Sequence, residues 1–345
     1  MQSRRTVLTM AGRALVLAPL NMIRSSMSSA AAVETKVSIA AVLSGPLGDM
    51  SFMDSANVGF KKIKADLGIP VRVVEGSASD APGWERNLTQ MSSSGRYDLI
   101  VTGSTQISSI LKKVAAQFPK QKYVIFDSTS VGPNVTGISF AQNEGAFLAG
   151  TLAGLVTKNP SLFPRAKGSN KVGVIGGKDI PVIRDFIVGF GQGAKLVDPK
   201  IIVDIRFTDD FGNAQKGFDV ATAMYNDGVD VIYQVAGGSG VGILQAGESS
   251  GRYSIGTDTD QSYLQPKSVV GSALKNVGAA VFNAADAFAK GKLEEGVTIR
   301  SDLKSDGVGF VINDKITPAS TATQLEAYRQ MVVSGKIVVE TVLGR

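Results

Sequence analysis

The segment at residues 230–242, Asp-Val-Ile-Tyr-Gln-Val-Ala-Gly-Gly-Ser-Gly-Val-Gly, decides how we interpret the rest of the chain. Its run from Val231 to Val235 is mostly apolar and β-branched, which is typical of a strand buried on both faces of a parallel sheet. The run ends in glycines, which allow a sharp turn or the close approach of another molecule. The segment therefore predicts a parallel strand whose carboxyl end opens into a small-molecule crevice.

Strand-like and helix-like stretches alternate on both sides of this segment. Expected strands cover residues 37–43, 71–75, 98–101, 123–126, 135–140, 171–175, 201–207, 230–235, 253–256, 269–275 and 307–312. Expected helices cover residues 52–67, 82–94, 106–118, 143–157, 181–196, 214–227, 241–250, 278–290 and 321–334. Small residues in the helix at 143–157 would permit close packing against a neighbour. The rhythm predicts an α/β fold of doubly wound parallel sheets with right-handed crossovers.

The length of 345 residues is too great for one typical core and suits two Rossmann-like lobes. We expect a first lobe from residues 33–140 plus 258–276, and a second lobe from residues 141–257 plus 277–315. Residues 316–345 would form a C-terminal helix and tail. Crossings between the lobes near Thr257, Asp258 and Asn276 would make a multi-strand hinge, which suits ligand-driven closure.

Composition narrows the possible chemistry. The chain contains no cysteine and no histidine, which excludes thiol nucleophiles, histidine-based triads, the usual zinc sites and haem ligation by histidine. The glycine clusters lack the spacing of a dinucleotide fingerprint, and no Gly-Lys-Ser/Thr follows any of them. We therefore expect a binding protein that is not an enzyme and that uses no cofactor and no metal.

The amino terminus has the pattern of an export signal, which we assign to residues 1–32. Paired arginines, Arg4 and Arg5, precede an apolar stretch at residues 14–20 and small residues at 28–32. This order fits a twin-arginine or a general secretory signal. The leader holds four arginines and no acidic residue, so it carries most of the net charge of +6, and no nucleic-acid surface is expected. Without a cysteine for a lipid anchor, we expect a soluble periplasmic protein.

Polar, aromatic and glycine residues follow the expected strands, where ligands bind in open α/β sheets. Phe52 and Phe211 could stack on a flat ring, at roughly 1–3 kcal/mol for each base-like contact. Asp49, Asp127 and Asp258 could accept hydrogen bonds from N–H or hydroxyl groups. Each residue also has a structural interpretation: Asp49 could cap the helix at 52–67, Asp258 could be a turn residue, and Lys275 could be a solvated lysine.

Seven motifs of the chain resemble the basic membrane protein (BMP) family of ABC transporter substrate-binding proteins, which includes purine nucleoside receptors. The motifs run in family order and lie at residues 48–52 (Gly-Asp-Met-Ser-Phe), 123–127 (Tyr-Val-Ile-Phe-Asp), 143–150 (Asn-Glu-Gly-Ala-Phe-Leu-Ala-Gly), 172–177 (Val-Gly-Val-Ile-Gly-Gly), 211–217 (Phe-Gly-Asn-Ala-Gln-Lys-Gly), 231–238 (Val-Ile-Tyr-Gln-Val-Ala-Gly-Gly) and 255–261 (Ile-Gly-Thr-Asp-Thr-Asp-Gln). The resemblance implies a type I periplasmic-binding-protein fold with a nucleoside held at the cleft between the lobes.

The resemblance also implies roles for individual residues. Phe52 and Phe211 look like the two stacking aromatics of the family, one from each lobe. Asp49 and Asp127 look like carboxylates that face the base or the ribose. Gly238 looks like the point where the backbone comes close to the ligand.

Three further positions belong to the expected site. Asp258 looks like the hinge-side ribose carboxylate, and Lys275 looks like the ribose-binding lysine beside it. Met53 stands where the family commonly has asparagine, and the loss of an amide there would relax or change base selectivity.

Together these features predict a periplasmic substrate-binding protein of an ABC importer. We expect a monomer that captures a nucleoside and delivers it to a permease and its ATPase in the inner membrane. A purine nucleoside is the preferred ligand. A receptor for a sugar, a riboflavin-like molecule or another small solute stays open, and so does a periplasmic ligand sensor. A nucleoside-processing enzyme that uses Asp49 and Asp127 is the alternative from another class.

Overall fold

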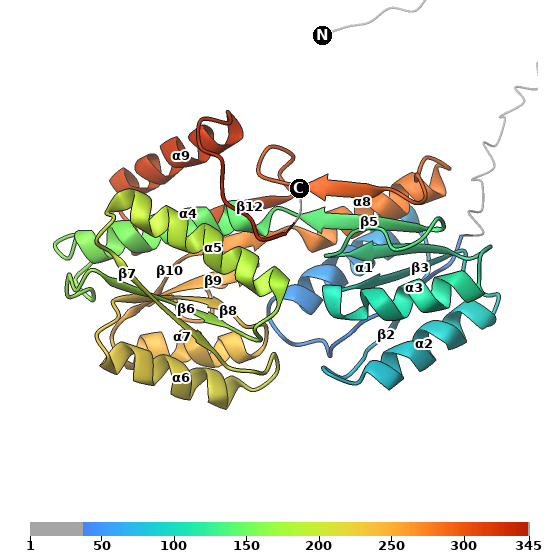
Figure 1. The fold of residues 1–345 in the computed structure, drawn as a ribbon, viewed down its shortest axis with the longest axis horizontal. Helices are drawn as coiled ribbons and strands as arrows, with labels where there is room; N and C mark the ends of the chain where they lie inside the picture. Colours follow the sequence, from blue (N-terminus) through green and yellow to red (C-terminus); the bar gives the residue numbers. More distant parts are fainter. Residues whose placement is uncertain (1–36, 344–345) are drawn as a thin grey trace, which may run out of the picture. The chain divides into compact units, whose positions relative to one another are not determined.

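Two six-stranded sheets organise the chain in a computed structural model that describes residues 37–343 (Figure 1). The first sheet has the order β11-β5-β4-β3-β1-β2, and all of its strand pairs are parallel. Its strands are β1 (Ile39–Val42), β2 (Val71–Val74), β3 (Leu99–Gly103), β4 (Lys122–Phe126), β5 (Val135–Phe140) and β11 (Thr298–Ser301). The export signal expected at residues 1–32 lies outside the described residues.

The second sheet has the order β12-β10-β9-β8-β6-β7. Its pairs are parallel except for β10 with β12, which are antiparallel. Its strands are β6 (Lys171–Gly176), β7 (Ile202–Phe207), β8 (Val231–Val235), β9 (Tyr253–Asp258), β10 (Val269–Lys275) and β12 (Val308–Ile312). The segment that opened the sequence analysis, β8, is buried along its whole length near the centre of this sheet.

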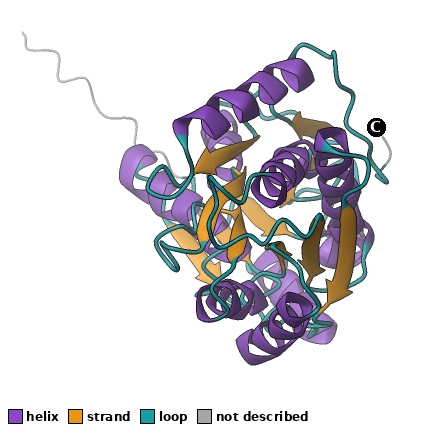
Figure 2. Ribbon diagram, turned by 90° about the vertical axis from the view of Figure 1, so that its left-hand side faces the viewer, coloured by secondary structure: helices purple, strands orange, loops and turns teal. Residues whose placement is uncertain are grey.

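Helices cover both faces of each sheet, as Figure 2 shows. In the first lobe α1 packs on α8 and α2 packs on α3, whereas in the second lobe α4 packs on α5 and α6 packs on α7. The helices are α1 (Phe52–Leu67), α2 (Ala81–Ser93), α3 (Ser108–Gln117), α4 (Gln142–Lys158), α5 (Pro181–Val197), α6 (Ala214–Asn226), α7 (Ser239–Ser249), α8 (Val277–Ala289) and α9 (Ala319–Val333), with a short 3-10 helix, η1 (Thr105–Ile107). The expected doubly wound α/β fold is confirmed.

The expected division of the lobes was wrong in its C-terminal half. Residues 258–276 do not return to the first lobe, because β10 pairs with β9 and β12 inside the second sheet. Residues 277–301 then form α8, which packs on α1, and β11, which pairs with β5 in the first sheet. The pattern at 269–275 identifies a strand but not its neighbours, so the sequence could not place it.

Three crossings therefore connect the lobes, at residues 140–142, 275–277 and 301–308. The crossing expected near Thr257 and Asp258 does not exist, because β9 and β10 belong to the same sheet, whereas the one expected near Asn276 is present. Hydrogen bonds join the crossings to one another: Ala141 N–H donates to the Ser301 carbonyl at 2.8 Å, and Asn276 N–H donates to the Gly307 carbonyl at 2.9 Å. These bonds make the hinge one unit.

Helices α4 and α5 lie unusually close because glycines replace side chains along their contact. A Cβ added at Gly150 would lie 1.9 Å from the Phe190 carbonyl oxygen, and one at Gly193 would lie 2.0 Å from the Phe147 carbonyl oxygen. Both atoms are backbone, so neither can move aside cheaply. The close packing expected from the small residues of α4 is confirmed.

We expect Gly150→Ala to destabilise the protein by at least about 1–3 kcal/mol, because the added methyl group overpacks a backbone contact. Gly191→Ala is the matched control on α5, since nothing lies within 4 Å of its added Cβ. It should be neutral or stabilising by about 0.5–1 kcal/mol, through helix propensity. Urea unfolding of both variants tests this expectation, and equal stabilities would contradict it.

Candidate functional site

One cavity of about 340 Å³ lies between the two sheets, at the carboxyl ends of their strands. This volume is at the lower end of the range of small-molecule pockets, about 300–1,000 Å³. All eight residues expected from the sequence line it: Asp49, Phe52, Met53, Asp127, Phe211, Gly238, Asp258 and Lys275. The structure therefore brings the whole expected set together, four residues from each lobe.

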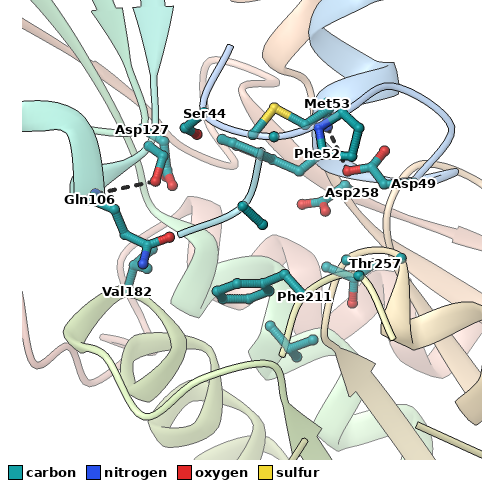
Figure 3. A pocket seen from close by; sticks show the side chains of 18 of the residues that line it. Ser44, Asp49, Phe52, Met53, Gln106, Asp127, Val182, Phe211, Thr257 and Asp258 are labelled. Carbon is teal, nitrogen blue, oxygen red and sulfur yellow. Dashed lines mark hydrogen bonds between the residues drawn. The ribbon is translucent and has the colours of Figure 1, made fainter. Parts of the chain in front are cut away.

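Two aromatic rings face the cavity from opposite sides, as Figure 3 shows. Phe52 is the first residue of α1, and its ring centroid lies 5.5 Å from that of Phe126. Phe211 lies in the loop between β7 and α6 and packs against Gly177, where an added Cβ would lie 2.3 Å from the ring. Each ring therefore packs against a residue of its own lobe, and we call the space between the two rings the aromatic slot.

A buried ion pair joins the lobes beside this slot. The Lys275 ammonium, at the end of β10, donates a hydrogen bond to the carboxylate of Asp127, which follows β4. The two residues are 2% and 9% exposed. The ammonium also lies 5.4 Å from the Phe52 ring centroid and 5.3 Å from that of Phe186. Burial raises the pKa of Asp127, and the charge of Lys275 opposes that shift.

The Asp49 carboxylate is committed mainly to helix α1. One of its oxygens accepts from Ser51 N–H at 3.0 Å and Asp54 N–H at 3.1 Å, and the other accepts from Met53 N–H at 2.8 Å. This is the helix-capping role that the sequence allowed. Burial raises the pKa of Asp49 against these bonds. Asp49 therefore presents an already anchored carboxylate at the cavity wall.

The Asp258 carboxylate of the second lobe is also held by a hydrogen bond from the protein. It accepts a hydrogen bond from the Ser51 hydroxyl of the first lobe. Burial raises its pKa to about 6, while the nearby Lys275 ammonium and the Ser51 bond oppose the shift. Asp127 and Asp258 both have left-handed backbones, with φ of 60° and 69°, a conformation that aspartate adopts more readily than most residues. This geometry turns each carboxylate from the end of its strand into the cavity.

Gly238 and Met53 shape the remaining walls. An added Cβ at Gly238 would lie 3.7 Å from the Cα of Asp49, so the second lobe closely approaches the first at this point. The Met53 side chain lies over Gly45, where an added Cβ would lie 3.4 Å from Cε. The position of the family's amide thus carries a flexible thioether.

Sequence reasoning missed the contribution of α5. Its first turns place Val182, Ile183 and Phe186 in the cavity wall, next to Ile180. Their apolar spacing also fits an ordinary core-facing helix, so no sequence signal separates the two roles. It also missed four residues of the first lobe that line the cavity: Ser77, Ala78 and Ser104 from loops, and Gln106 from η1.

A polar contact also joins the two lobes outside the cavity lining. The Lys178 ammonium of the second lobe donates to the Ser79 hydroxyl of the first lobe at 2.7 Å, and it lies 5.9 Å from the Phe211 ring centroid. Within residues 37–343, no group of three or more acidic side chains is placed to hold a metal ion. The cavity thus combines an aromatic slot, three carboxylates and one ammonium, which suits a flat molecule with several N–H or hydroxyl donors.

Comparison with known proteins identifies the family of the chain. Residues 36–341 match the family described as ABC transporter substrate-binding protein, PnrA-like. The chain belongs to this family. The resemblance inferred from the seven motifs is therefore confirmed, and so is the fold class.

Relatives of this PnrA-like protein cover most of its length. It is 31% identical over 311 residues to basic membrane protein A2 of Borrelia garinii, which covers 88% of each chain. It is 33% identical over 261 residues to the ABC transporter nucleoside-binding protein BmpA of Lactococcus lactis, which covers 70% of this chain and 71% of that protein.

A solved structure supports the fold of this PnrA-like protein. An ABC transporter solute-binding protein from Aeropyrum pernix superposes with a TM-score of 0.78 at 27% identity, over 88% of this chain and 94% of that one. Among the described residues of the PnrA-like protein, no helix is both long and apolar enough to cross a membrane.

The raised pKa of Asp258 predicts a pH-dependent stability. Because the pKa is about 6 in the folded protein and about 3.9 in unfolded chains, the folded state binds this proton more tightly. The resulting stabilisation is complete below the unfolded pKa and is lost as the pH rises through about 6. Asp258→Asn should therefore gain stability relative to the wild type above pH 6, by about 2–3 kcal/mol.

Urea unfolding between pH 4 and 8 in the absence of ligand checks this expectation. Asp314→Asn is the control, because Asp314 is an exposed carboxylate away from the cavity, and its stability should follow the wild type at every pH. A constant difference between Asp258→Asn and the wild type across this range would contradict the burial of the charge.

Proposed function

We propose that this protein captures a nucleoside in the cavity between its lobes and delivers it to an ABC permease and its ATPase. Among nucleosides, we propose a purine nucleoside as the preferred ligand. The expected export signal would place it in the periplasm as a soluble monomer. It would bind the ligand without transforming it. Closure of the lobes around the three crossings would bury the ligand, and the permease would recognise the closed form.

The observation that carries the proposal is the pair of opposed rings, Phe52 and Phe211, beside fixed carboxylates. Stacking is worth roughly 1–3 kcal/mol for each base-like contact and tolerates any flat ring. The carboxylates add selectivity, because a ligand without N–H or hydroxyl donors would cover their remaining acceptor positions without a hydrogen bond. The part of the cavity wall that contains Asp258 and Lys275 is polar and suits the hydroxyl groups of a ribose.

A riboflavin-like or other heteroaromatic solute is the second candidate, and Met53 favours it. Together with Leu47, Pro46 and Ile180, Met53 gives part of the cavity wall an apolar character. A ring with a hydrophobic edge would fit this part better than the polar edge of a purine. A sugar lacks a large flat face, so the two phenylalanines disfavour it.

Native mass spectrometry of the purified protein, followed by thermal shift against nucleosides, nucleobases, riboflavin and monosaccharides, tests the proposal. A purine nucleoside should raise the melting temperature by mass action and should be recovered unchanged after long incubation. Phe211→Ala should weaken this binding by about tenfold or more, from the loss of one stacking contact.

A matched control is Phe118→Ala, since Phe118 lies at the end of α3 outside the cavity. Its nucleoside affinity should equal that of the wild type. If riboflavin alone raises the melting temperature, the nucleoside is wrong and riboflavin is the ligand. A shift with sugars alone, insensitive to Phe211→Ala, would contradict the aromatic slot.

A further inference from the structure

The C-terminal segment at residues 336–343, called here the C-terminal strap, is bonded to helices α4 and α5. Figure 1 shows it running from α9 toward α5. The Asn143 amide of α4 donates to the Glu340 carbonyl at 2.9 Å, and the Gln192 amide of α5 donates to the Val338 carbonyl at 3.0 Å. Val339 is 5% exposed. The strap is thus part of the packed structure of the second lobe.

The strap ends on a buried carboxylate, Asp185 of α5, which is 1% exposed. One oxygen of Asp185 accepts from the Thr341 hydroxyl at 2.5 Å and from Val342 N–H at 3.0 Å. The other accepts from the Gln142 amide at 2.6 Å. Within the described residues no lysine or arginine forms an ion pair with Asp185. Two of the three hydrogen bonds that compensate this buried group therefore come from the strap.

Asp185 lies where the hinge and the cavity wall meet. Gln142 is the first residue of α4 and belongs to the crossing at residues 140–142. On α5, Asp185 neighbours Phe186, which lines the cavity and lies under the Lys275 ammonium. Its charge is also one of the causes that raise the pKa of Asp127, after burial. The strap, the hinge and the first turns of α5 thus share one junction.

A buried carboxylate is an unusual choice if the strap only adds stability. An apolar side chain would anchor the strap without the desolvation cost of a charge, and replacing both partners of a buried hydrogen bond by apolar groups can be nearly neutral or stabilising. Directional hydrogen bonds instead fix the relative orientation of the groups that make them. The hydrogen bonds of Asp185 therefore orient the strap and the start of α4 relative to α5.

We propose that the C-terminal strap is a positioning element of the ligand site. Through Thr341 and Val342 it holds Asp185, and through Asp185 and Gln142 it fixes the first turns of α5 relative to the hinge crossing. Loss of these bonds loosens the cavity wall formed by Val182, Ile183 and Phe186 and weakens ligand binding, although no strap residue lines the cavity.

Thr341→Val tests the proposal, because it removes the hydroxyl donor and keeps the shape of the side chain. Amide hydrogen exchange of the ligand-free protein should become about tenfold faster in the first turns of α4 and α5, as expected for a lost hydrogen bond to a charged group. Exchange in α2 and α3 of the first lobe should not change. Thr341→Ser retains the donor and should restore wild-type exchange.

Thr323→Val is the matched control, because Thr323 is an exposed threonine on α9 whose hydroxyl bonds only within its own helix. A chain that ends at Glu340 removes both strap donors while keeping Val339, so it provides a second variant if Thr341→Val folds poorly. Equal exchange in Thr341→Val, the shortened chain and Thr323→Val would overturn the proposal. A uniform increase across both lobes would also overturn it, since it would indicate a general loss of stability.

A second experiment measures the affinity for inosine, and it rests on the proposed function. Thr341→Val should bind inosine about tenfold more weakly than the wild type, and Thr341→Ser should restore the affinity. If the wild type binds no inosine, the proposed function fails, whereas the exchange experiment without ligand still decides the role of the strap. Unchanged inosine affinity beside faster exchange would overturn the coupling between strap and site.

Discussion

The buried ion pair between Lys275 and Asp127 is the interaction on which the site depends. Removing two charges from water costs several kcal/mol for each ion, so the pair is tolerable only when its partners stay together. Because Lys275 ends a strand of the second sheet and Asp127 follows a strand of the first, the pair joins the two lobes beside the hinge. Around it, Phe52 and Phe186 provide aromatic faces for the unused part of the ammonium.

The same constraint explains why the cavity has both an aromatic and a polar part. Next to the pair, Asp258 stays partly compensated by the Ser51 hydroxyl, and the carboxylate of Asp49 is satisfied by the N-terminus of α1. Every charged group of the site is therefore held by protein before any ligand arrives. A site organised in advance loses less entropy when it binds, which favours both affinity and selectivity.

The contents of the site could be predicted from the sequence because parallel strands present their carboxyl ends at one edge of a sheet. Asp127 and Asp258 each follow or end an apolar run, so the fold class predicts that they lie at the carboxyl ends of strands. The place of Lys275 in the site was predicted from the resemblance to the family. Partner choice could not be predicted in the same way. Strand β10 has the same pattern whichever sheet it joins. The β11 sequence, Thr-Ile-Arg-Ser, is mostly exposed at a sheet edge and carries no buried-strand signal.

Long-range contacts also could not be predicted from the sequence. Val182, Ile183 and Phe186 look like ordinary core residues of an amphipathic helix, and Thr341 contacts Asp185 across more than 150 positions of chain.

A crystal structure of the protein grown with inosine tests the account most directly. The account predicts the purine ring between Phe52 and Phe211, with the ribose hydroxyls within hydrogen-bond distance of Asp258 and Lys275. A purine bound elsewhere, or a cavity that stays free of it at saturating inosine, would contradict the account.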